Sequence, residues 1–442
     1  MRSPRFSLLL AKEARELLAS RAYWLLLLAA GILAGHSAVT AFDTYAEMSG
    51  AGGGPSALRQ GLNPLDGIVI PLAGTLSLVA TLLLPFVVIR QVGHERTTGA
   101  WKLMAQGPAR TGSIVAAKVI VLLGGFCVAW IPTLTALGLW RAAGNHLDGP
   151  ETLGVGLAQL LFGWLIIGVG AAAAAMTSQE ATAAIIALGF TIGGWALELM
   201  ASLKGGFFAE LAGFSPSTVL RTIEQGLLTP GLLLALLGVG GAGIWLAELW
   251  LRPGLTLTRR ISGSLVAGCL ALVVIAAGSR IHWYGDLSED RRNSFSRADQ
   301  VALASIPGQL DIAVHLAPED PRITDLQRGV LGKLQRTMPR VSVTNVAGSR
   351  TGLFERDENY GLIRYDYQGR SVSSRATTPE IVLENIYQLA GQPVPAREDP
   401  GYPGYPLITR PRHTGLFLFG VWPLVLGLGY WWSRREPARP NP

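Results

Sequence analysis

The stretch "IVIPLAGTLSLVATLLLPFVVI", residues 68–89, contains no charged side chain. A helix needs about 20 consecutive, mostly apolar residues to cross the hydrocarbon core of a bilayer, so this stretch predicts a transmembrane helix. Stretches of the same kind recur on both sides of it, near residues 22–42, 119–140, 153–176, 182–201, 231–251, 261–278 and 414–432. The sequence therefore predicts a polytopic α-helical membrane protein with about eight transmembrane helices.

The charged residues support this interpretation by their number and their position. The 442 residues are 49% hydrophobic and only 15% charged, whereas about a quarter of the residues in ordinary soluble proteins are charged. With the N-terminus in the cytoplasm, the inner segments carry 16 Lys and Arg residues, and the outer loops between the first six spans carry four. This positive-inside asymmetry predicts that both termini are cytoplasmic. The net charge of +7 is spread over short loops, which excludes a continuous basic surface for nucleic acid.

Residues 280–413 differ from the rest, with 17 Lys and Arg balanced by 16 Asp and Glu. "DIAVHL" and "VSVTNV" alternate as strands do, a hairpin turns at Gly369, and residues 324–337 and 379–390 carry an apolar helical stripe. The order β-α-β-β-β-α predicts a small extracytoplasmic α/β domain inserted between helices 7 and 8. A stiff, proline-rich stalk at 393–406 leads from this domain back to the membrane.

Two shorter amphipathic helices are predicted beside the spans. Residues 5–20 have an apolar stripe that suits a helix lying on the membrane, with four charged side chains predicted to face away from it: Lys12, Glu13, Arg15 and Glu16. Between the fifth and sixth spans, Ser217 is the predicted N-cap of a helix whose apolar face holds Leu220, Ile223 and Leu227. That helix either dips into the outer leaflet or lies flat on the surface.

Sequence motifs for catalysis do not emerge. The string nearest to a phosphate-binding loop, "GVLGKL" at 329–334, lacks the glycine spacing and the Ser or Thr after Lys. The histidines are scattered, and both cysteines, Cys127 and Cys269, lie within predicted spans. His36 and Glu198 are ionisable residues within or near spans and are therefore candidates for a transport role, although snorkelling to the outer interface explains them as well. We expect no enzyme activity, no metal site and no cofactor in this chain.

"GHERTTGAWKLMAQGPAR", residues 93–110, is a polar, basic stretch between the second and third spans. Residues 95–105 can form about three helical turns, with Gly99 as a mild interruption and Gly107-Pro108 as the end. Such a helix could pass force from a cytoplasmic motor to the two spans that it joins. Alternatively, it is a solvated loop that obeys the positive-inside rule, and the residues alone leave both interpretations open.

The same stretch resembles the first cytoplasmic loop of ABC type-2 exporter permeases. That pattern runs Glu-Arg, a Gly three residues on, an apolar helix, then Pro, a basic residue and a Lys that starts the next span. The matching residues here are Glu95, Arg96, Gly99, Leu103, Pro108, Arg110 and Lys118. Ala100 departs from the Thr that often follows the Gly. "KEARELLASRAYWLLL" resembles the interfacial N-terminal helix of the same family, and the resemblance covers about residues 5–252.

"WYGDLSEDRRNSFSRA" and "YGLIRYDYQGRSVSSRATTPEIVLENIYQLAG" resemble a second family, the gliding-motility-type auxiliary subunit of ABC transporters. This resemblance covers about residues 261–432 and implies an extracytoplasmic domain, here much shorter than usual, held between two membrane helices. Together the two resemblances imply a cytoplasmic interfacial helix, a six-helix ABC permease domain, a linker with the seventh transmembrane helix, an extracytoplasmic α/β domain with its stalk, and an eighth transmembrane helix with a cytoplasmic tail. These parts correspond to residues 1–21, 22–252, 253–279, 280–413 and 414–442.

The resemblances imply the permease subunit of an ABC-type transporter in the bacterial cytoplasmic (inner) membrane. A separate ABC ATPase subunit, in two copies, would bind ATP and drive export or extraction of an envelope substrate. A second membrane protomer, identical or homologous, would complete the pathway, and the outer domain could meet an extracytoplasmic protein. Two alternatives remain open: a subunit that moves its outer domain mechanically to regulate an envelope or motility partner without transport, and a membrane-anchored binding scaffold without a motor.

The residues expected to couple to the ATPase lie in the polar stretch: His94, Glu95, Arg96, Thr97, Thr98, Gly99, Trp101 and Lys102. We expect Glu95 and Arg96 to make charged contacts with a groove on the ATPase. Gly99 would allow close approach of the two backbones, and Trp101 would be an apolar anchor or lie in the membrane interface. No substrate-binding residue is predicted.

Overall fold

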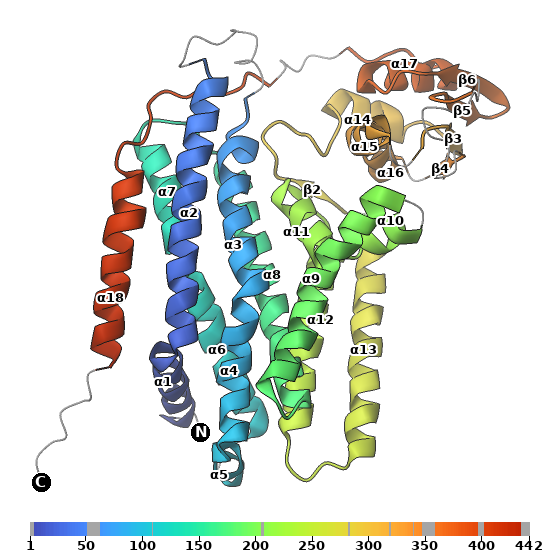
Figure 1. The fold of residues 1–442 in the computed structure, drawn as a ribbon. Coiled ribbons are helices and arrows are strands. Elements are labelled where there is room, and N and C mark those ends of the chain that lie inside the picture. The colour runs from blue at the N-terminus through green and yellow to red at the C-terminus, as the bar shows by residue number, and fades with distance from the viewer. Residues whose placement is uncertain are drawn as a thin grey trace, which may run out of the picture.

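The computed structural model describes residues 4–50, 62–107, 109–204, 207–281, 283–317, 320–338, 340–346, 359–396 and 402–434. Long helices stand side by side as a bundle, and a small α/β domain covers part of one end of it (Figure 1). We call this the domain end of the bundle. The opposite end is called the α5 end, after the short helix α5 (Ala100–Gln106) that lies there.

Eight helical stretches in the described residues are long and apolar enough to cross a membrane, as predicted. They are α2 (Arg21–Met48), η2–α3–α4 (Leu65–Val69, Ile70–Leu82 and Leu84–Thr97), α6–α7 (Thr111–Val128 and Ile131–Ala142), α8 (Gly149–Met176), α9 (Glu180–Lys204), α12 (Pro230–Leu251), α13 (Leu257–Ser279) and η4–α18 (Leu416–Val421 and Trp422–Ser433). The helix α1 (Pro4–Ala19) lies at the α5 end.

The second span is longer than the predicted residues 68–89. Pro85 lies in the first turn of α4, where its missing N–H removes no helical hydrogen bond. The helix then continues to Thr97, and it stops because Gly99 adopts a left-handed conformation with φ +77°. The polar residues 90–97 are therefore the last two turns of a spanning helix and not the beginning of a separate one.

Helix α8 is central to the bundle and packs against α4, α9 and α12. Glycines let α12 approach it at backbone distance. A Cβ atom on Gly168 would lie 2.2 Å from the carbonyl oxygen of Gly240, and one on Gly243 would lie 2.5 Å from that of Gly168. Small residues at such crossings are the usual means by which membrane helices pack closely, so the seam between α8 and α12 is closed.

Helices α13 and α18 lie at the edges of the bundle. α13 packs mainly against α12, and α18 returns to the side of α2. The indole Nε1 of Trp422 donates a hydrogen bond of 3.1 Å to the carbonyl oxygen of Leu27, and its ring covers Gly31. Most of the large apolar side chains on both edge helices are exposed, as expected of surfaces that contact lipid.

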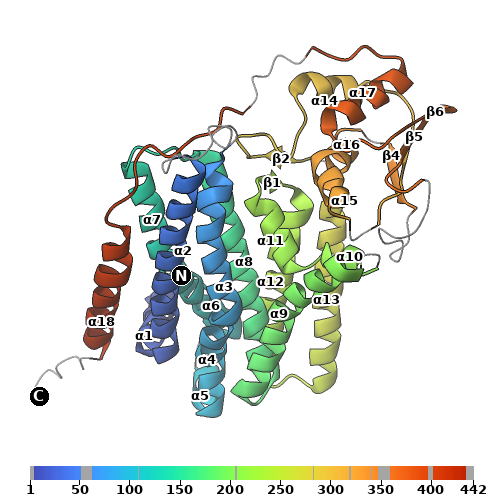
Figure 2. The same ribbon diagram turned by 45° about the horizontal axis from the view of Figure 1, so that its top comes forward.

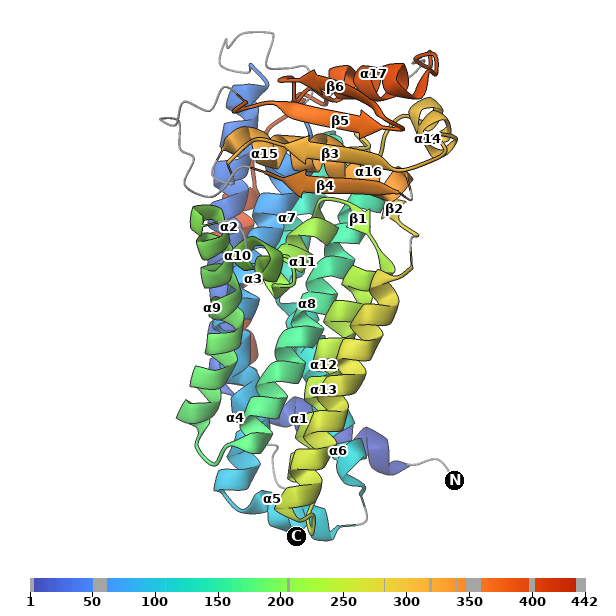
Figure 3. The same ribbon diagram turned by 90° about the vertical axis from the view of Figure 1, so that its right-hand side faces the viewer.

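The α/β domain has the predicted order β-α-β-β-β-α, preceded by a helix that was not predicted. Its elements are α14 (Arg297–Ala304), β3 (Leu310–Val314), α15–η3–α16 (Pro321–Leu326, Gln327–Leu331 and Gly332–Thr337), β4 (Val341–Asn345), β5 (Ile363–Tyr367), β6 (Arg370–Ser374) and α17 (Pro379–Ala390). The sheet order is β4-β3-β5-β6, with β3 and β4 parallel and the other pairs antiparallel (Figure 3). The apolar core of this domain extends from Phe295 to Leu389 and is separate from the cores of the bundle.

Two segments connect this domain to the bundle. Before it, β2 (Gly285–Asp286) pairs antiparallel with β1 (Leu227–Leu228). After it, the chain crosses the domain end to reach α18 (Figure 2), and the Tyr405 N–H donates to the carbonyl oxygen of Leu62 at 2.9 Å.

Between α9 and β1 lie the short helices α10 (Phe207–Ala212) and α11 (Pro216–Glu224). The N-cap of α11 is Ser215, whose Oγ accepts a hydrogen bond from the Thr218 N–H, and not the predicted Ser217. Pro216 explains the difference, because proline suits the first helical position and so sets the cap at the residue before it.

Candidate functional site

The predicted coupling residues lie at the α5 end, but they do not form one continuous helix. His94, Glu95, Arg96 and Thr97 form the last turn of α4, Thr98 and Gly99 make the break, and Trp101 and Lys102 lie on α5. The prediction of a single helix with a mild interruption was wrong because the positive φ of Gly99 ends α4 completely.

Glu95 lies inside the bundle and not on the surface where a partner could reach it. Its side chain is buried, with 4% of the residue exposed. It forms an ion pair with Lys12 of α1 and another with Lys118 of α6, the latter at 3.0 Å. The expectation that Glu95 contacts a partner protein is therefore corrected: its carboxylate is occupied by two amines of its own chain.

Glu13 completes this cluster, although the sequence predicted only that it faces away from the apolar stripe of its helix. It is 0% exposed, and its carboxylate accepts hydrogen bonds of 2.8 Å from both Lys118 and Gln91. Lys118, which is 1% exposed, also donates to the carbonyl oxygen of Gln91 at 2.9 Å. The buried charged cluster, defined as Lys12, Glu13, Glu95 and Lys118, holds two carboxylates and two amines, so it is electrically balanced and binds α1 to α4 and α6.

Lys12 closes the cluster at its solvent side. Burial opposes the charged form of this amine, but its bonds with Glu95, Glu13 and Glu16 outweigh that effect and raise the pKa of Lys12 above its ordinary value. Lys12 therefore stays charged at neutral pH. The carboxylates of Glu13, Glu16 and Glu95 lie within 4.8 Å of one another. Lys12 pairs with all three and Lys118 also pairs with Glu13 and Glu95, so we do not interpret the group as a metal site.

Arg96 is directed toward the end of α8. Its Nη1 donates to three backbone carbonyl oxygens, those of Ala174, Ala175 and Thr177, at 2.7, 2.8 and 2.6 Å. The last carbonyls of a helix have no helical partner and carry partial negative charge. Arg96 therefore caps α8, which corrects the expectation that it makes a charged contact with a partner.

Trp101 fixes α5 to the bundle. Its ring is buried, and its Nε1 donates a hydrogen bond of 3.1 Å to the carbonyl oxygen of Leu251 at the end of α12. The sequence predicted that Trp101 anchors the ATPase or lies in the membrane interface, whereas the structure shows it anchoring α5 within its own chain. Gly99 has nothing within 4 Å of a Cβ built on it, so its close-approach role is not visible in this chain alone.

Three side chains thus tie the α4–α5 corner to four other helices. Glu95 reaches α1 and α6, Arg96 reaches α8, and Trp101 reaches α12. The residues that remain exposed around this corner include His94, Thr97, Thr98, Lys102 and Leu103. Any force applied to that exposed surface would be shared with α1, α6, α8 and α12, because the anchors leave the corner little freedom to move by itself.

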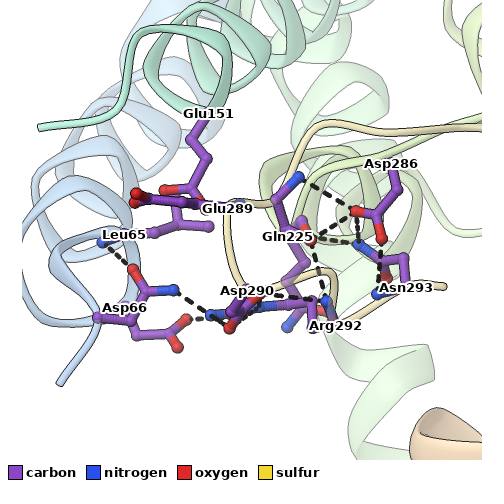
Figure 4. A network of polar contacts seen from close by, with 11 residues as sticks. Leu65, Asp66, Glu151, Gln225, Asp286, Glu289, Asp290, Arg292 and Asn293 are labelled. Carbon is purple, nitrogen blue, oxygen red and sulfur yellow. Dashed lines mark hydrogen bonds and ion pairs between the residues drawn. The ribbon is translucent and has the colours of Figure 1, made fainter. Parts of the chain in front are cut away.

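A second polar network lies at the domain end (Figure 4). Arg292 donates to Asp290 and forms an ion pair of 2.7 Å with Asp66 of η2. Asn63 donates to Asp290 at 3.2 Å, and the Glu289 N–H donates to the carboxylate of Glu151 at 2.6 Å. We call this set the collar, and it fixes the chain entering the α/β domain onto the ends of η2 and α8.

Arg292 is held charged within the collar. Burial alone would lower the pKa of Arg292, but its hydrogen bonds to Asp66 and Asp290 raise that pKa above its ordinary value. Burial likewise opposes ionisation of Asp290, yet the bonds from Arg292 and Asn63 hold the pKa of this carboxyl below its usual range. The ion pairs of the collar therefore persist at neutral pH.

The two ionisable residues predicted near spans have different surroundings. Glu198 accepts hydrogen bonds of 3.0 Å from Ser215 and Thr218 and pairs with Arg221 at 3.4 Å, so it ties α9 to α11. His36 lines a cavity at the domain end. A buried contact that the sequence did not indicate is the hydrogen bond of 2.6 Å from Gln159 of α8 to Glu224 of α11.

Comparisons with known proteins returned no similar family, curated protein or solved structure.

Proposed function

We propose that this chain is the permease subunit of an ABC-type transporter and that it carries the movement of a separate ATPase into its spans. The observation that supports this most is the anchoring of the α4–α5 corner by Glu95, Arg96 and Trp101 to α1, α6, α8 and α12. A solvated loop would not need three buried anchors. In this proposal the α5 end and both termini face the bacterial cytoplasm, and the α/β domain is extracytoplasmic.

The docking surface for the ATPase is the exposed part of the corner: His94, Thr97, Thr98, Lys102 and Leu103. Leu103 is 73% exposed at a helical position outside the apolar core. An exposed leucine on a rigid helix can fill a pocket on a partner, and a few such residues carry most of the energy of an interface. Two ATPase copies and a second membrane protomer would complete the transporter.

The test replaces Leu103 with Glu and follows the complex. The chain is purified from native membranes, bound proteins are identified by mass, and ATP hydrolysis is measured. We expect wild type to retain an ATPase and Leu103→Glu to lose it, with affinity at least about tenfold weaker, which corresponds to about 1.4 kcal/mol. The matched control is Val301→Glu, because Val301 is 67% exposed on α14 in the α/β domain.

Two results would contradict the proposal. One is that no ATPase accompanies the wild-type chain under any mild extraction, which favours the scaffold without a motor. The other is that Leu103→Glu and Val301→Glu both retain the ATPase and its turnover at wild-type levels. The α4–α5 corner would then be a rigid connector and nothing more.

The mechanical alternative, without transport, is favoured by one observation: the glycine contacts close the seam between α8 and α12. A cavity of about 500 Å³ bordered by α12, α13 and α9 favours transport. The two are separated by reconstituting the chain with its ATPase and measuring ATP-dependent movement of a labelled lipid between leaflets. Normal ATP turnover without such movement would favour the mechanical alternative.

A further inference from the structure

An apolar cavity among the spanning helices lies toward the domain end. It is a cavity of about 500 Å³ whose walls come from α8, α9, α11, α12 and α13 and from the segment after α10; apolar lining residues include Leu165, Phe190, Phe214, Val219, Leu232 and Ile275. Its size falls within the range of about 300–1,000 Å³ that is usual for small-molecule sites. Figure 3 shows α9 and α10 on one side of α11 and α12, with α13 on the other.

The cavity is next to the apolar edge of the bundle. α13 packs mainly against α12, and its large side chains Leu265, Leu270, Leu272 and Val273 are exposed. In a bilayer these side chains are surrounded by hydrocarbon. An acyl chain from the surrounding lipid could therefore enter between α13 and α9 without crossing water.

One end of the cavity is polar and belongs to the α/β domain. Gln335 and Arg336 of α16 and Tyr284 line it there. The Arg336 guanidinium donates from Nη2 to the Asn293 carbonyl oxygen at 2.8 Å and lies 5.7 Å from the centre of the Tyr284 ring. Its Nε–H is buried and has no hydrogen-bond partner among the described residues.

A buried donor on a charged group that makes no hydrogen bond destabilises the protein, because nothing replaces the bond that it makes with water in the unfolded chain. Burial indeed lowers the pKa of Arg336, which shows that its charge is poorly solvated. An anionic oxygen placed at the mouth of the cavity would accept from this guanidinium in a charge-assisted bond. A purely apolar occupant could not accept this hydrogen bond, so the Arg336 guanidinium would stay incompletely paired.

We propose that this cavity binds an acyl chain of an anionic lipid taken from the bilayer, with the phosphate of its headgroup against Arg336. This deepens the proposed function, because it names acidic membrane lipids as the substrate class. The claim that the lipid is transported rests on the proposed function, whereas the claim that it binds does not. Binding itself needs no ATPase. A helix from a second copy of the chain is the competing occupant, and it would supply apolar side chains but no anion.

The binding test uses the full chain in detergent and two probes, phosphatidylglycerol and phosphatidylcholine, with bound lipids counted by native mass spectrometry. We expect one phosphatidylglycerol molecule to bind at least about tenfold more tightly than phosphatidylcholine. Ala235→Trp places an indole in the cavity, since Ala235 is among its lining residues, and should abolish this binding. The matched control is Ala276→Trp on α13, because Ala276 is exposed beside the cavity residue Ile275.

Arg336→Gln tests the headgroup contact. It should reduce phosphatidylglycerol binding by about tenfold and make the two lipids bind alike, whereas Arg336→Lys should restore part of the preference because it keeps the charge. Thermal unfolding of each variant is measured in parallel. If Arg336→Gln does not fold, the comparison of Ala235→Trp with Ala276→Trp still tests whether the lipid occupies the cavity.

Two outcomes would overturn the proposal: equal binding of both lipids by wild type, or unchanged phosphatidylglycerol binding by Ala235→Trp. Loss of a dimer in Ala235→Trp without any change in lipid would assign the cavity to a second copy. If the lipid binds as expected but no ATPase moves it, the lipid site is confirmed and the proposed transport function is wrong.

Discussion

At the scale of single residues, the buried charged cluster can contribute to the stability of the fold or to the placement of α1. Glu13 and Lys118 are both almost fully buried and 2.8 Å apart. Removing two charges from water costs energy that their attraction offsets only when further hydrogen bonds satisfy both groups. Gln91 supplies those bonds through its side chain and its carbonyl oxygen. The pair therefore fixes how α1 sits on the bundle more than it adds stability.

The first prediction follows from this balance. Lys118→Met leaves two buried carboxylates, Glu13 and Glu95, with Lys12 as their one amine, and Glu13→Gln leaves Lys118 with Glu95 alone. Each change unbalances the buried charges, so each should destabilise the chain by up to about 3–5 kcal/mol. The double variant should be more stable than the sum of the two losses indicates, because no unpaired charge from this pair remains. Thermal unfolding in detergent measures all three. Additive losses would show that the pair is not coupled.

The second prediction concerns Glu224, a buried carboxyl on α11. Burial raises the pKa of Glu224 to about 7, and the bond from Gln159 offsets this only in part. A carboxyl whose folded pKa lies above its unfolded value binds more protons when folded, so stability is highest below about pH 4.5 and falls as the pH rises through 7. The loss is on the order of 3 kcal/mol.

Glu224→Gln removes this titration. The variant should unfold at a higher temperature than wild type at pH 8 and should gain less at pH 5. The same substitution at Glu384, which is exposed on α17, is the control and should change little at either pH. A gain at pH 5 that equals or exceeds the gain at pH 8 would contradict the assignment.

At the scale of helices, the α4–α5 corner depends on one backbone position. Gly99 has φ +77°, and a Cβ atom there would meet nothing within 4 Å. The cost of a side chain at this residue is therefore one of backbone conformation alone, about 1–2 kcal/mol for a left-handed non-glycine residue. Helix α5 and its Trp101 anchor would be reoriented if the corner relaxed to another conformation.

The third prediction compares two glycine substitutions that differ only in backbone conformation. Gly99→Ala should lower stability by about 1–2 kcal/mol and weaken the proposed coupling to an ATPase. Gly124→Ala in α6 also has open space at its Cβ but a helical backbone, so it should be neutral or stabilising by up to about 1 kcal/mol. Unfolding temperatures of the two variants test this, and equal shifts of the same sign would refute it.

Local patterns explain which elements the sequence could predict. All eight spans and the β-α-β-β-β-α order follow from apolar run length and from alternation along short segments, which are properties of neighbouring residues. The burial of Glu13 is not such a property, because its partners Gln91 and Lys118 are 78 and 105 residues away. Lys118, a lone amine at the start of an apolar span, was the signal that a buried carboxylate must meet it.

At the scale of the whole molecule, the two ends of the bundle are organised in the same way. Each end has a polar network that ties a segment outside the spans to several spanning helices: the buried charged cluster for α1, and the collar for the chain entering the α/β domain. The chain leaving that domain is held as well, since Asn145 accepts from the Ile408 N–H at 2.8 Å. Movement at the α5 end can therefore reach the α/β domain through η2 and α8.

The fourth prediction tests whether the collar holds the domain. Arg292 bonds to Asp290, two residues before it, and also reaches Asp66 of η2. Arg322 bonds to Asp320 in the same way, two residues before it at 2.7 Å, but within the domain. The two arginines share one local motif. Arg292→Met removes a link to the bundle, whereas Arg322→Met removes a similar bond within the domain only.

Hydrogen exchange measures the result at β1 and β2, where the bundle and the entering chain share backbone hydrogen bonds. Arg292→Met should speed exchange there by about tenfold or more, because a bond to a charged group contributes about 1.5–3 kcal/mol. Exchange in the sheet β4-β3-β5-β6 should stay unchanged, since its core is separate from the bundle. Arg322→Met should leave β1 and β2 at the wild-type rate. If both variants exchange alike at β1 and β2, the ion pair adds nothing to the attachment, and movement from the bundle would reach the α/β domain through the strand pairing and the remaining bonds of the collar.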